Sequence, residues 1–342
     1  MTRFVTTVEG EAAVVRVPGL DDAAEVRLWS DLDLGDTAFT RVDPGWELRL
    51  AGLPVDRLEY LVDVDGATRP DPTHDRAVDG PFGAHSWLPL AGYAEPDWLA
   101  LPRIASERAG VVFEDTPVGD VEVTVWAPAD ADGEEPLPML CCHDGPEMAD
   151  YGGILDWAGA LVGDGRLPRM RVALLSPGPR NERYAANPAY AEALTGHVVP
   201  GLRDACPTDH RPVLVGQSLG AVAALHAAWT SPGCFAGLML QSGSFFTPEL
   251  DPQESDFEYW DEVTGFVASL LAASTAAPDA PLVAMTCGTA EENYANNLRM
   301  RDHLAATGMT VAWGEVRQGH TWTCWRDSLD PHLTDLLRKV WG

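Results

Sequence analysis

One stretch of the chain has the residue types and spacing of a nucleophile site. Residues 213–222 read VLVGQSLGAV and place Ser218 between Gly216 and Gly220. The preceding apolar run favours a β-strand, and LGAVAALHAAWTS after the serine favours a helix. A serine on a sharp strand-to-helix turn is typical of a nucleophile elbow, in which glycines allow close backbone packing. The pattern therefore predicts that Ser218 is a nucleophile and that the Leu219 N–H helps to hold an oxyanion, rather than a turn that only packs well.

A serine hydroxyl is a weak nucleophile unless a base takes its proton. In chains with such an elbow, the acid and then the histidine follow the serine. His143 precedes the serine, and His226 lies on the helix after the elbow, on a face expected to pack. His320, in RQGHTW, directly follows the last predicted strand. We therefore predict that His320 is the base.

The acid is expected just after the preceding strand, where LVAMTCGTAEEN offers Glu291 and Glu292. Glu291 comes first after the turn Gly288-Thr289, so we favour it. A carboxylate there would fix the histidine tautomer and stabilise the imidazolium. The alternative is that both glutamates only place negative charge in the first turn of the next helix.

A second oxyanion donor is expected in the loop after CCHDG. Gly145 or Glu147 can donate a backbone N–H there. Pro146 cannot, because proline has no N–H. The sequence leaves the choice between Gly145 and Glu147 open.

Two patterns of predicted elements divide the chain. Short β-like runs separated by turn residues occupy the first 90 residues and suggest a small β-sandwich: AAVVRV, AEVRLWS, AFTRV, WELRLAG and EYLVDVDG. From about residue 120, strands alternate with helices, which predicts a parallel sheet covered on both faces. We expect an all-β domain over 1–100 and an α/β catalytic domain over 101–342.

The composition of the chain restricts the classes of molecule that it can bind. The 342 residues include 23 basic and 52 acidic ones, for a net charge of −29. This charge argues against nucleic acids and anionic membranes as partners. No apolar run reaches the ~18 residues of a membrane helix. The N-terminal residues lack the pattern of a signal peptide, so we expect a cytoplasmic protein.

The six cysteines show no metal-ligand spacing and are expected to be buried, reduced thiols. We expect no metal and no cofactor. The sequence leaves open whether the chain forms a homodimer.

Three motifs in order, GQSLG, CGTAEEN and QGHTWTCWR, resemble those of enterochelin (enterobactin) esterases and feruloyl esterases. HDGPEM resembles the oxyanion loop of this family, and RNERYAANPAY resembles the segment after its fourth strand. The N-terminal part, with YLVDVDG and RPDP, resembles the small Ig-like domain of enterochelin esterases. The resemblance covers nearly the whole chain. It implies an α/β-hydrolase fold, with a mostly parallel sheet and helices on both faces, preceded by a small β-sandwich.

Carried over by position, the resemblance implies Ser218 as nucleophile, His320 as base and Glu291 as acid. Two positions depart from the family pattern. Pro146 stands where the family often has a donor residue, and Thr321 replaces the usual aspartate after the histidine. These departures bear on the substrate more than on the reaction.

Enterochelin esterases cleave a trilactone of catechol-bearing serines, and catecholates are anionic. The resemblance thus makes Arg180 and Arg183 candidates for substrate binding. The alternative is that they are surface arginines paired with acids such as Glu182. Trp322 is a candidate for an aromatic pocket wall, whereas Trp325 is expected in the core.

We therefore expect a serine esterase that hydrolyses a small-molecule carboxylic ester through an acyl-enzyme, with a siderophore trilactone or a related natural-product ester as substrate. An acyltransferase or cyclising thioesterase would use the same triad, because the difference lies in the access of the acceptor. A non-catalytic binding protein on the same fold is the third alternative. The filled triad positions argue against it.

Overall fold

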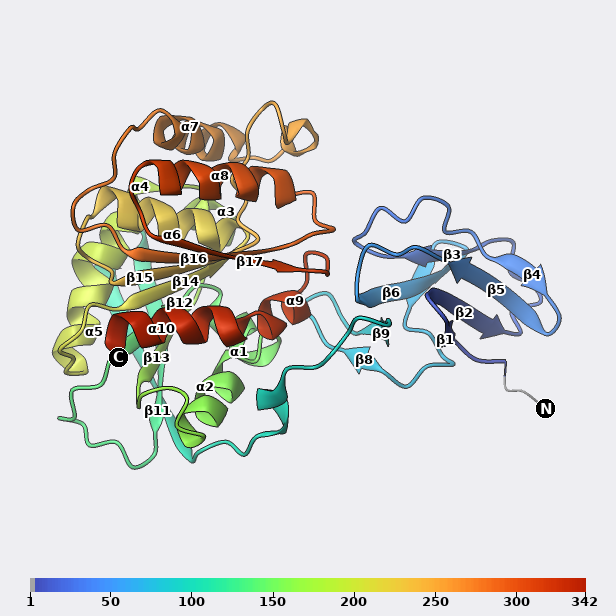
Figure 1. Ribbon diagram of the computed structural model, residues 1–342, viewed down its shortest axis with the longest axis horizontal. Helices are drawn as coiled ribbons and strands as arrows, with labels where there is room; N and C mark the ends of the chain where they lie inside the picture. The colour runs from blue at the N-terminus through green and yellow to red at the C-terminus, as the bar shows by residue number, and fades with distance from the viewer. Residues whose placement is uncertain (1–3) are drawn as a thin grey trace. The chain divides into compact units, whose positions relative to one another are not determined.

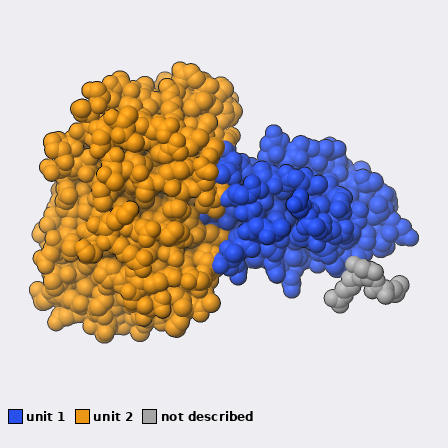
Figure 2. Space-filling model, in the orientation of Figure 1, with its two compact units in different colours: residues 1–95, 288–291, 317–324 blue, residues 96–287, 292–316, 325–342 orange. Residues whose placement is uncertain are grey.

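The structure is a computed structural model that describes residues 4–342, and it divides into two compact units (Figure 2). The first unit contains the described residues up to Glu95 together with 288–291 and 317–324. The second contains the remainder of the chain from Pro96 onward. The first unit therefore includes two short segments from the C-terminal part of the sequence.

The N-terminal part of the first unit is a β-sandwich, as the sequence predicts. One sheet has the order β1-β2-β5-β4 and the other β3-β6-β9-β8, with β7 paired to β6. Val15 and Leu48 of the first sheet and Leu58 and Val62 of the second share one buried apolar core. The strands are β1 (Thr7–Glu9), β2 (Ala12–Pro18), β3 (Val26–Trp29), β4 (Thr40–Val42), β5 (Gly45–Leu50), β6 (Arg57–Val64), β7 (Ala67–Arg69), β8 (Ala77–Val78) and β9 (His85–Pro89).

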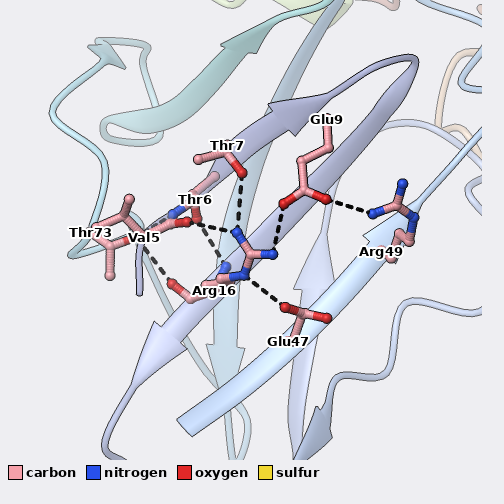
Figure 3. Close-up of polar contacts among 8 residues, drawn as sticks. All are labelled: Val5, Thr6, Thr7, Glu9, Arg16, Glu47, Arg49 and Thr73. Atoms are coloured by element: carbon pink, nitrogen blue, oxygen red, sulfur yellow. Dashed lines mark hydrogen bonds and ion pairs between the residues drawn. The ribbon is translucent and has the colours of Figure 1, made fainter. Parts of the chain in front are cut away.

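Arg16 links three strands of the first sheet (Figure 3). Its guanidinium donates to Glu47 at 2.7 Å, Glu9 at 2.8 Å and the Thr7 hydroxyl at 3.2 Å. Arg16 and Glu47 are also direct cross-strand partners. Opposite charges facing each other across a sheet favour this register by a few tenths of a kcal/mol up to about 1 kcal/mol.

The larger sheet has the order β10-β11-β13-β12-β14-β15-β16-β17. The pairs from β13 through β12, β14 and β15 to β16 are parallel, whereas β10 and β11 form an antiparallel edge. This order with its covering helices confirms the α/β-hydrolase fold. The strands are β10 (Ser106–Thr116), β11 (Gly119–Pro128), β12 (Met139–Cys142), β13 (Arg171–Leu175), β14 (Val213–Gln217), β15 (Gly237–Gln241), β16 (Leu282–Gly288) and β17 (Val311–Val316).

Helices cover both faces of this sheet. In Figure 1, α6 and α8 lie on one side of the central strands and α10 on the other. Every residue of β14 and β15 is buried, as expected for strands covered on two faces. The α-helices are α1 (Gly145–Asp150), α2 (Ile154–Gly163), α3 (Arg180–Tyr184), α4 (Pro188–Glu192), α5 (Val199–Ala205), α6 (Leu219–Thr230), α7 (Trp260–Leu271), α8 (Tyr294–Ala306), α9 (Trp322–Asp327) and α10 (Thr334–Trp341). Short 3-10 or π-helical turns are η1 (Asp97–Ala100), η2 (Ala193–Val198), η3 (Pro252–Glu254) and η4 (Leu329–Leu333).

Within residues 4–342, no helix combines the length and apolar character that crossing a membrane requires. All six cysteines are free thiols, and four of them are buried: Cys141, Cys142, Cys287 and Cys324. Burial raises the pKa of Cys141 to about 12, so this thiol stays protonated at neutral pH.

Candidate active site

The turn after β14 has the backbone conformation of a nucleophile elbow. Ser218 has φ 55° and ψ −123°, which an L-residue adopts only under strain. A Cβ on Gly216 would collide with the backbone carbonyl of Gly220. A Cβ on Gly220 would lie 3.3 Å from both the Asp144 carboxylate and the His143 Cβ. Close packing therefore requires glycine at position 216, and a side chain at position 220 would displace its neighbours by a few tenths of an ångström.

Strained residues gather where three neighbouring strands end. Asp144, Ser218 and Ser242 have φ angles of 48°, 55° and 50°. They follow β12, β14 and β15, which are adjacent in the sheet. Strained non-glycine residues persist only where their surroundings hold them, and they cluster at functional sites. This edge of the sheet is therefore the best candidate for the site.

Hydrogen bonds fix Ser218 against the end of β15. Its N–H donates to the Gln241 carbonyl at 2.9 Å, and its own carbonyl accepts from the Ser244 N–H at 3.1 Å. The Ser218 and Ser244 hydroxyl oxygens are 3.2 Å apart. The sequence reasoning missed Ser244. The signal was present, because QSGS directly follows a strand that pairs with the elbow strand.

A buried polar network lies behind the elbow. The Gln217 amide donates to Gln241 at 3.1 Å, and the Gln241 amide donates to the Trp325 carbonyl at 2.9 Å and to Ser328 at 2.8 Å. The Trp325 indole N–H donates to the Ser242 hydroxyl at 3.0 Å. Trp325 is thus a core residue, as expected, and it ties the last helices to the strand ends.

In the first unit, the predicted base and acid meet. His320 Nδ1 lies 2.7 Å from Glu291 Oε2. The other carboxylate oxygen accepts the Gly288 N–H at 2.7 Å, and the Glu291 side chain is fully buried. About a third of the His320 side chain (34%) is exposed. Glu292 is exposed, and α8 begins only at Tyr294.

The loop that carries His320 is anchored to the β-sandwich within the same unit. The Asp56 N–H donates to the Arg317 carbonyl at 2.6 Å, and the Arg317 guanidinium pairs with the Asp56 carboxylate at 3.0 Å. A small cavity beside this loop is lined by Ser30, Asp31, Leu32, Arg57, Glu59, Gly319 and Thr321. Arg57 is buried and paired with Glu59, so its charge is neutralised locally.

The predicted oxyanion donors lie at two helix starts of the second unit. Leu219 is the first residue of α6, and Gly145 is the first residue of α1. The first N–H groups of a helix have no partner within the helix. A Cβ on Gly145 would collide with the backbone of Leu174, so the loop runs tightly along β13. Glu147 is half-buried, and Pro146 is exposed.

Asp144, directly before Gly145, forms an ion pair in which the carboxylate is buried and the Arg180 side chain is about a third exposed (35%). The Arg180 guanidinium donates to both Asp144 carboxylate oxygens, at 2.7 and 2.9 Å. Burial, with the Arg180 charge acting in the same direction, lowers the pKa of His143 to about 3, so its ring is neutral. Arg180 thus pairs with an acid, which was the alternative to substrate binding, but the acid is Asp144 and not Glu182.

The remaining candidates lie as follows. Arg183 is buried, and its guanidinium donates to the carbonyls of Val118 at 3.0 Å and Asp120 at 2.9 Å. Trp322, the first residue of α9, is half-buried. His226 is buried with its ring edge-on to Phe266 at 4.9 Å, as expected for a packing residue.

In the sequence, the three proposed triad residues each come after a strand of the larger sheet. Ser218 follows β14, Glu291 follows β16 and His320 follows β17. Chemically, the parts comprise a strained serine, a histidine oriented by a buried carboxylate and N–H groups at two helix starts. These are the parts that acyl transfer to serine requires.

Comparisons with known proteins find esterases among the relatives of this chain. A family model named Esterase matches residues 116–336. The chain is 25% identical over 218 residues to the iron(III) salmochelin esterase of Escherichia coli O6:H1, covering 61% of this chain and 52% of that protein. The chain spans about half the length of most of the curated relatives that it matches.

Solved structures share the fold. A ferric enterobactin esterase from Salmonella typhimurium superimposes with a TM-score of 0.82 at 18% identity, covering 99% of this chain and 98% of that one. A ferulic acid esterase superimposes with a TM-score of 0.57 at 17% identity, covering 69% of this chain and 99% of that one. The first similarity extends over the β-sandwich as well as the α/β domain.

Proposed function

Because the chain belongs to the Esterase family, we propose that it is a serine hydrolase that cleaves a small-molecule carboxylic ester. The observation that carries the proposal is the 2.7 Å contact between His320 and the buried Glu291. The carboxylate orients the ring through Nδ1, so that Nε2 can act as the base. The strained Ser218 supplies the nucleophile.

In the proposed reaction, the Ser218 oxygen attacks the ester carbonyl while His320 Nε2 takes the serine proton. The resulting oxyanion accepts hydrogen bonds from the Leu219 N–H and from Gly145 or Glu147. The tetrahedral intermediate then collapses, and His320 returns the proton to the leaving alcohol. Water, deprotonated by His320, then attacks the acyl-enzyme; the bond between the acyl carbon and the Ser218 oxygen breaks, His320 returns the proton to Ser218, and the acid is released. Glu291 stabilises the imidazolium in both halves of the reaction.

For the substrate, we propose a siderophore trilactone or a related natural-product ester. The support is the names of the relatives, which are iron(III) salmochelin and enterobactin esterases. Trp322 is the proposed aromatic contact, because it follows His320 by two residues.

A fluorophosphonate probe and an ester panel test the function together. Wild-type protein should be labelled at Ser218 and should hydrolyse p-nitrophenyl esters. Ser218→Ala should lose the label and about 10³- to 10⁶-fold in kcat/KM. Ser244→Ala, the matched control, should keep the label. Folded wild-type protein without label or turnover would refute the proposal, and labelling without hydrolysis would favour the acyltransferase.

A further inference from the structure

The residue before the proposed oxyanion donor is held in a strained conformation. Asp144 has a left-handed backbone, and its side chain is only 3% exposed. Its carboxylate approaches the elbow, because Oδ2 would lie 3.3 Å from a Cβ on Gly220. Gly145 follows it directly in the chain. Any change in the backbone of Asp144 would therefore move the donor loop.

Two groups on α3 hold Asp144. The Arg180 guanidinium donates through Nε and one terminal nitrogen to the two carboxylate oxygens, at 2.7 and 2.9 Å. The Tyr184 hydroxyl accepts the Asp144 backbone N–H at 3.1 Å. The same guanidinium lies 5.4 Å over the Tyr184 ring. Side chain and backbone of Asp144 are thus both fixed by one short helix.

Removing only one partner of the Arg180–Asp144 ion pair destabilises the fold. A buried carboxylate that loses its cation is left without compensation and must relax toward water or take up a proton. A two-bond contact also fixes orientation, which a single point charge does not. Arg180 is therefore required both for the charge of Asp144 and for its direction.

We propose that Arg180 is a positioning residue, which holds the oxyanion loop through Asp144 and does not recognise a charged group of the substrate. The inference rests on the proposed esterase function. Asp144 uses two of the five guanidinium N–H groups, so an anionic substrate would have to bind the remaining N–H groups of a cation whose charge the buried Asp144 carboxylate already balances. Removing Arg180 should then misplace the donor at Gly145 or Glu147 for every ester, whatever its charge.

The test compares a neutral and an anionic ester. Arg180→Gln and Arg180→Lys are assayed with p-nitrophenyl butyrate and with the p-nitrophenyl monoester of glutaric acid. We expect kcat to fall by about 10- to 100-fold on both esters with little change in KM, since displacing one oxyanion donor mainly affects the transition state. The affinity of a boronic acid inhibitor should fall in parallel with kcat/KM. Arg103→Gln, which breaks the exposed pair with Asp156, is the control and should leave kcat unchanged.

The outcomes separate the two roles. A loss confined to the anionic ester and seen in KM would show that Arg180 binds substrate and would overturn the inference. Unchanged kinetics in a folded Arg180 variant would overturn it as well. Wild-type protein without ester turnover would refute the proposed function and the inference with it.

A second variant serves as the control if Arg180→Gln has a folding defect. If Arg180→Gln does not fold, the double variant Arg180→Gln/Asp144→Asn removes the unpaired charge and should restore folding. It should still show the loss of kcat on both esters. Normal kcat in the folded double variant would overturn the inference.

Discussion

Glu291 holds two different partners with its two oxygen atoms. One oxygen faces His320, and the other accepts the Gly288 N–H, so the carboxylate cannot rotate away from the imidazole. Glu292, one residue later, is exposed. The two side chains are chemically identical, and only their surroundings assign them different roles.

We predict that Glu291→Gln lowers kcat by about 10²- to 10⁴-fold, because the neutral amide cannot stabilise the imidazolium and can favour the wrong tautomer. Glu292→Gln is the matched control and should stay within about threefold of wild type. Steady-state kinetics on p-nitrophenyl butyrate measures both. A larger loss in the Glu292 variant would exchange the two roles.

Sequence reasoning can propose site residues where they follow predictable strands. Ser218, Glu291 and His320 each come just after an apolar run, so their order and position could be read directly. The partner of Arg180 could not be predicted in this way. Asp144 lies 36 residues earlier, and only the packing of α3 against the loop after β12 brings the two together.

At the scale of elements, the elbow depends on the close approach of β14 and α6. Gly216 is the next-to-last residue of the buried strand, and Gly220 lies in the first turn of the helix. Because a side chain on Gly216 would meet backbone rather than a movable side chain, no rotamer change can relieve the clash. The strand and helix would have to separate.

Gly216→Ala should therefore lower the free energy of unfolding by about 2 to 4 kcal/mol, above the usual cost of one added methyl group in a core. Gly265→Ala in α7 is the control, since a Cβ there meets no atom within 4 Å. It should leave stability unchanged or raise it by up to about 1 kcal/mol. Urea unfolding measures both, and a Gly216 variant as stable as wild type would contradict the close packing of the elbow.

Elements with a clear apolar pattern were predictable, and elements without one were not. The five predicted runs of the sandwich correspond to β2 to β6, and β14 to β17 match their predicted segments, whereas β1, β7, β8 and β9 were not predicted. The edge strand β10 was missed, because most of its residues are exposed and its apolar side chains Val111 and Phe113 are only partly buried. The alternative that placed Glu291 in the first turn of the next helix does not describe the structure, because α8 begins at Tyr294. The Glu291 carboxylate instead accepts the Gly288 N–H and contacts His320.

At the scale of the whole molecule, the compact units do not follow the order of the chain. The segments 288–291 and 317–324, which contain Glu291 and His320, belong to the same unit as the N-terminal sandwich. The sequence predicted two continuous domains, because composition and periodicity report neighbours along the chain. Composition and periodicity do not predict contacts between residues far apart in the sequence, such as the contact of Asp56 with Arg317.

The net charge of −29 affects the stability of the entire fold. Most arginine–carboxylate pairs among the described residues are partly exposed, such as Arg27–Glu25 and Arg169–Asp130, and such pairs contribute between about 0 and 1 kcal/mol each. More than half of the acidic residues have no cation to balance them, as 52 acids face 23 bases. Their mutual repulsion opposes the compact state and is screened by salt.

We predict that raising NaCl from 20 mM to 0.5 M at pH 7.5 increases the melting temperature by about 2 to 8 °C. Salt also weakens the exposed ion pairs, but this loss is smaller than the relief of repulsion at such an excess of acid. Choline chloride at equal ionic strength should act similarly, because the effect is screening rather than binding of one cation. Near pH 4.5, close to the isoelectric point of about 4.4, the repulsion disappears and the same salt step should leave the melting temperature unchanged or lower it. Differential scanning calorimetry measures the four conditions, and a melting temperature that falls with salt at pH 7.5 would show that ion pairs outweigh the net repulsion.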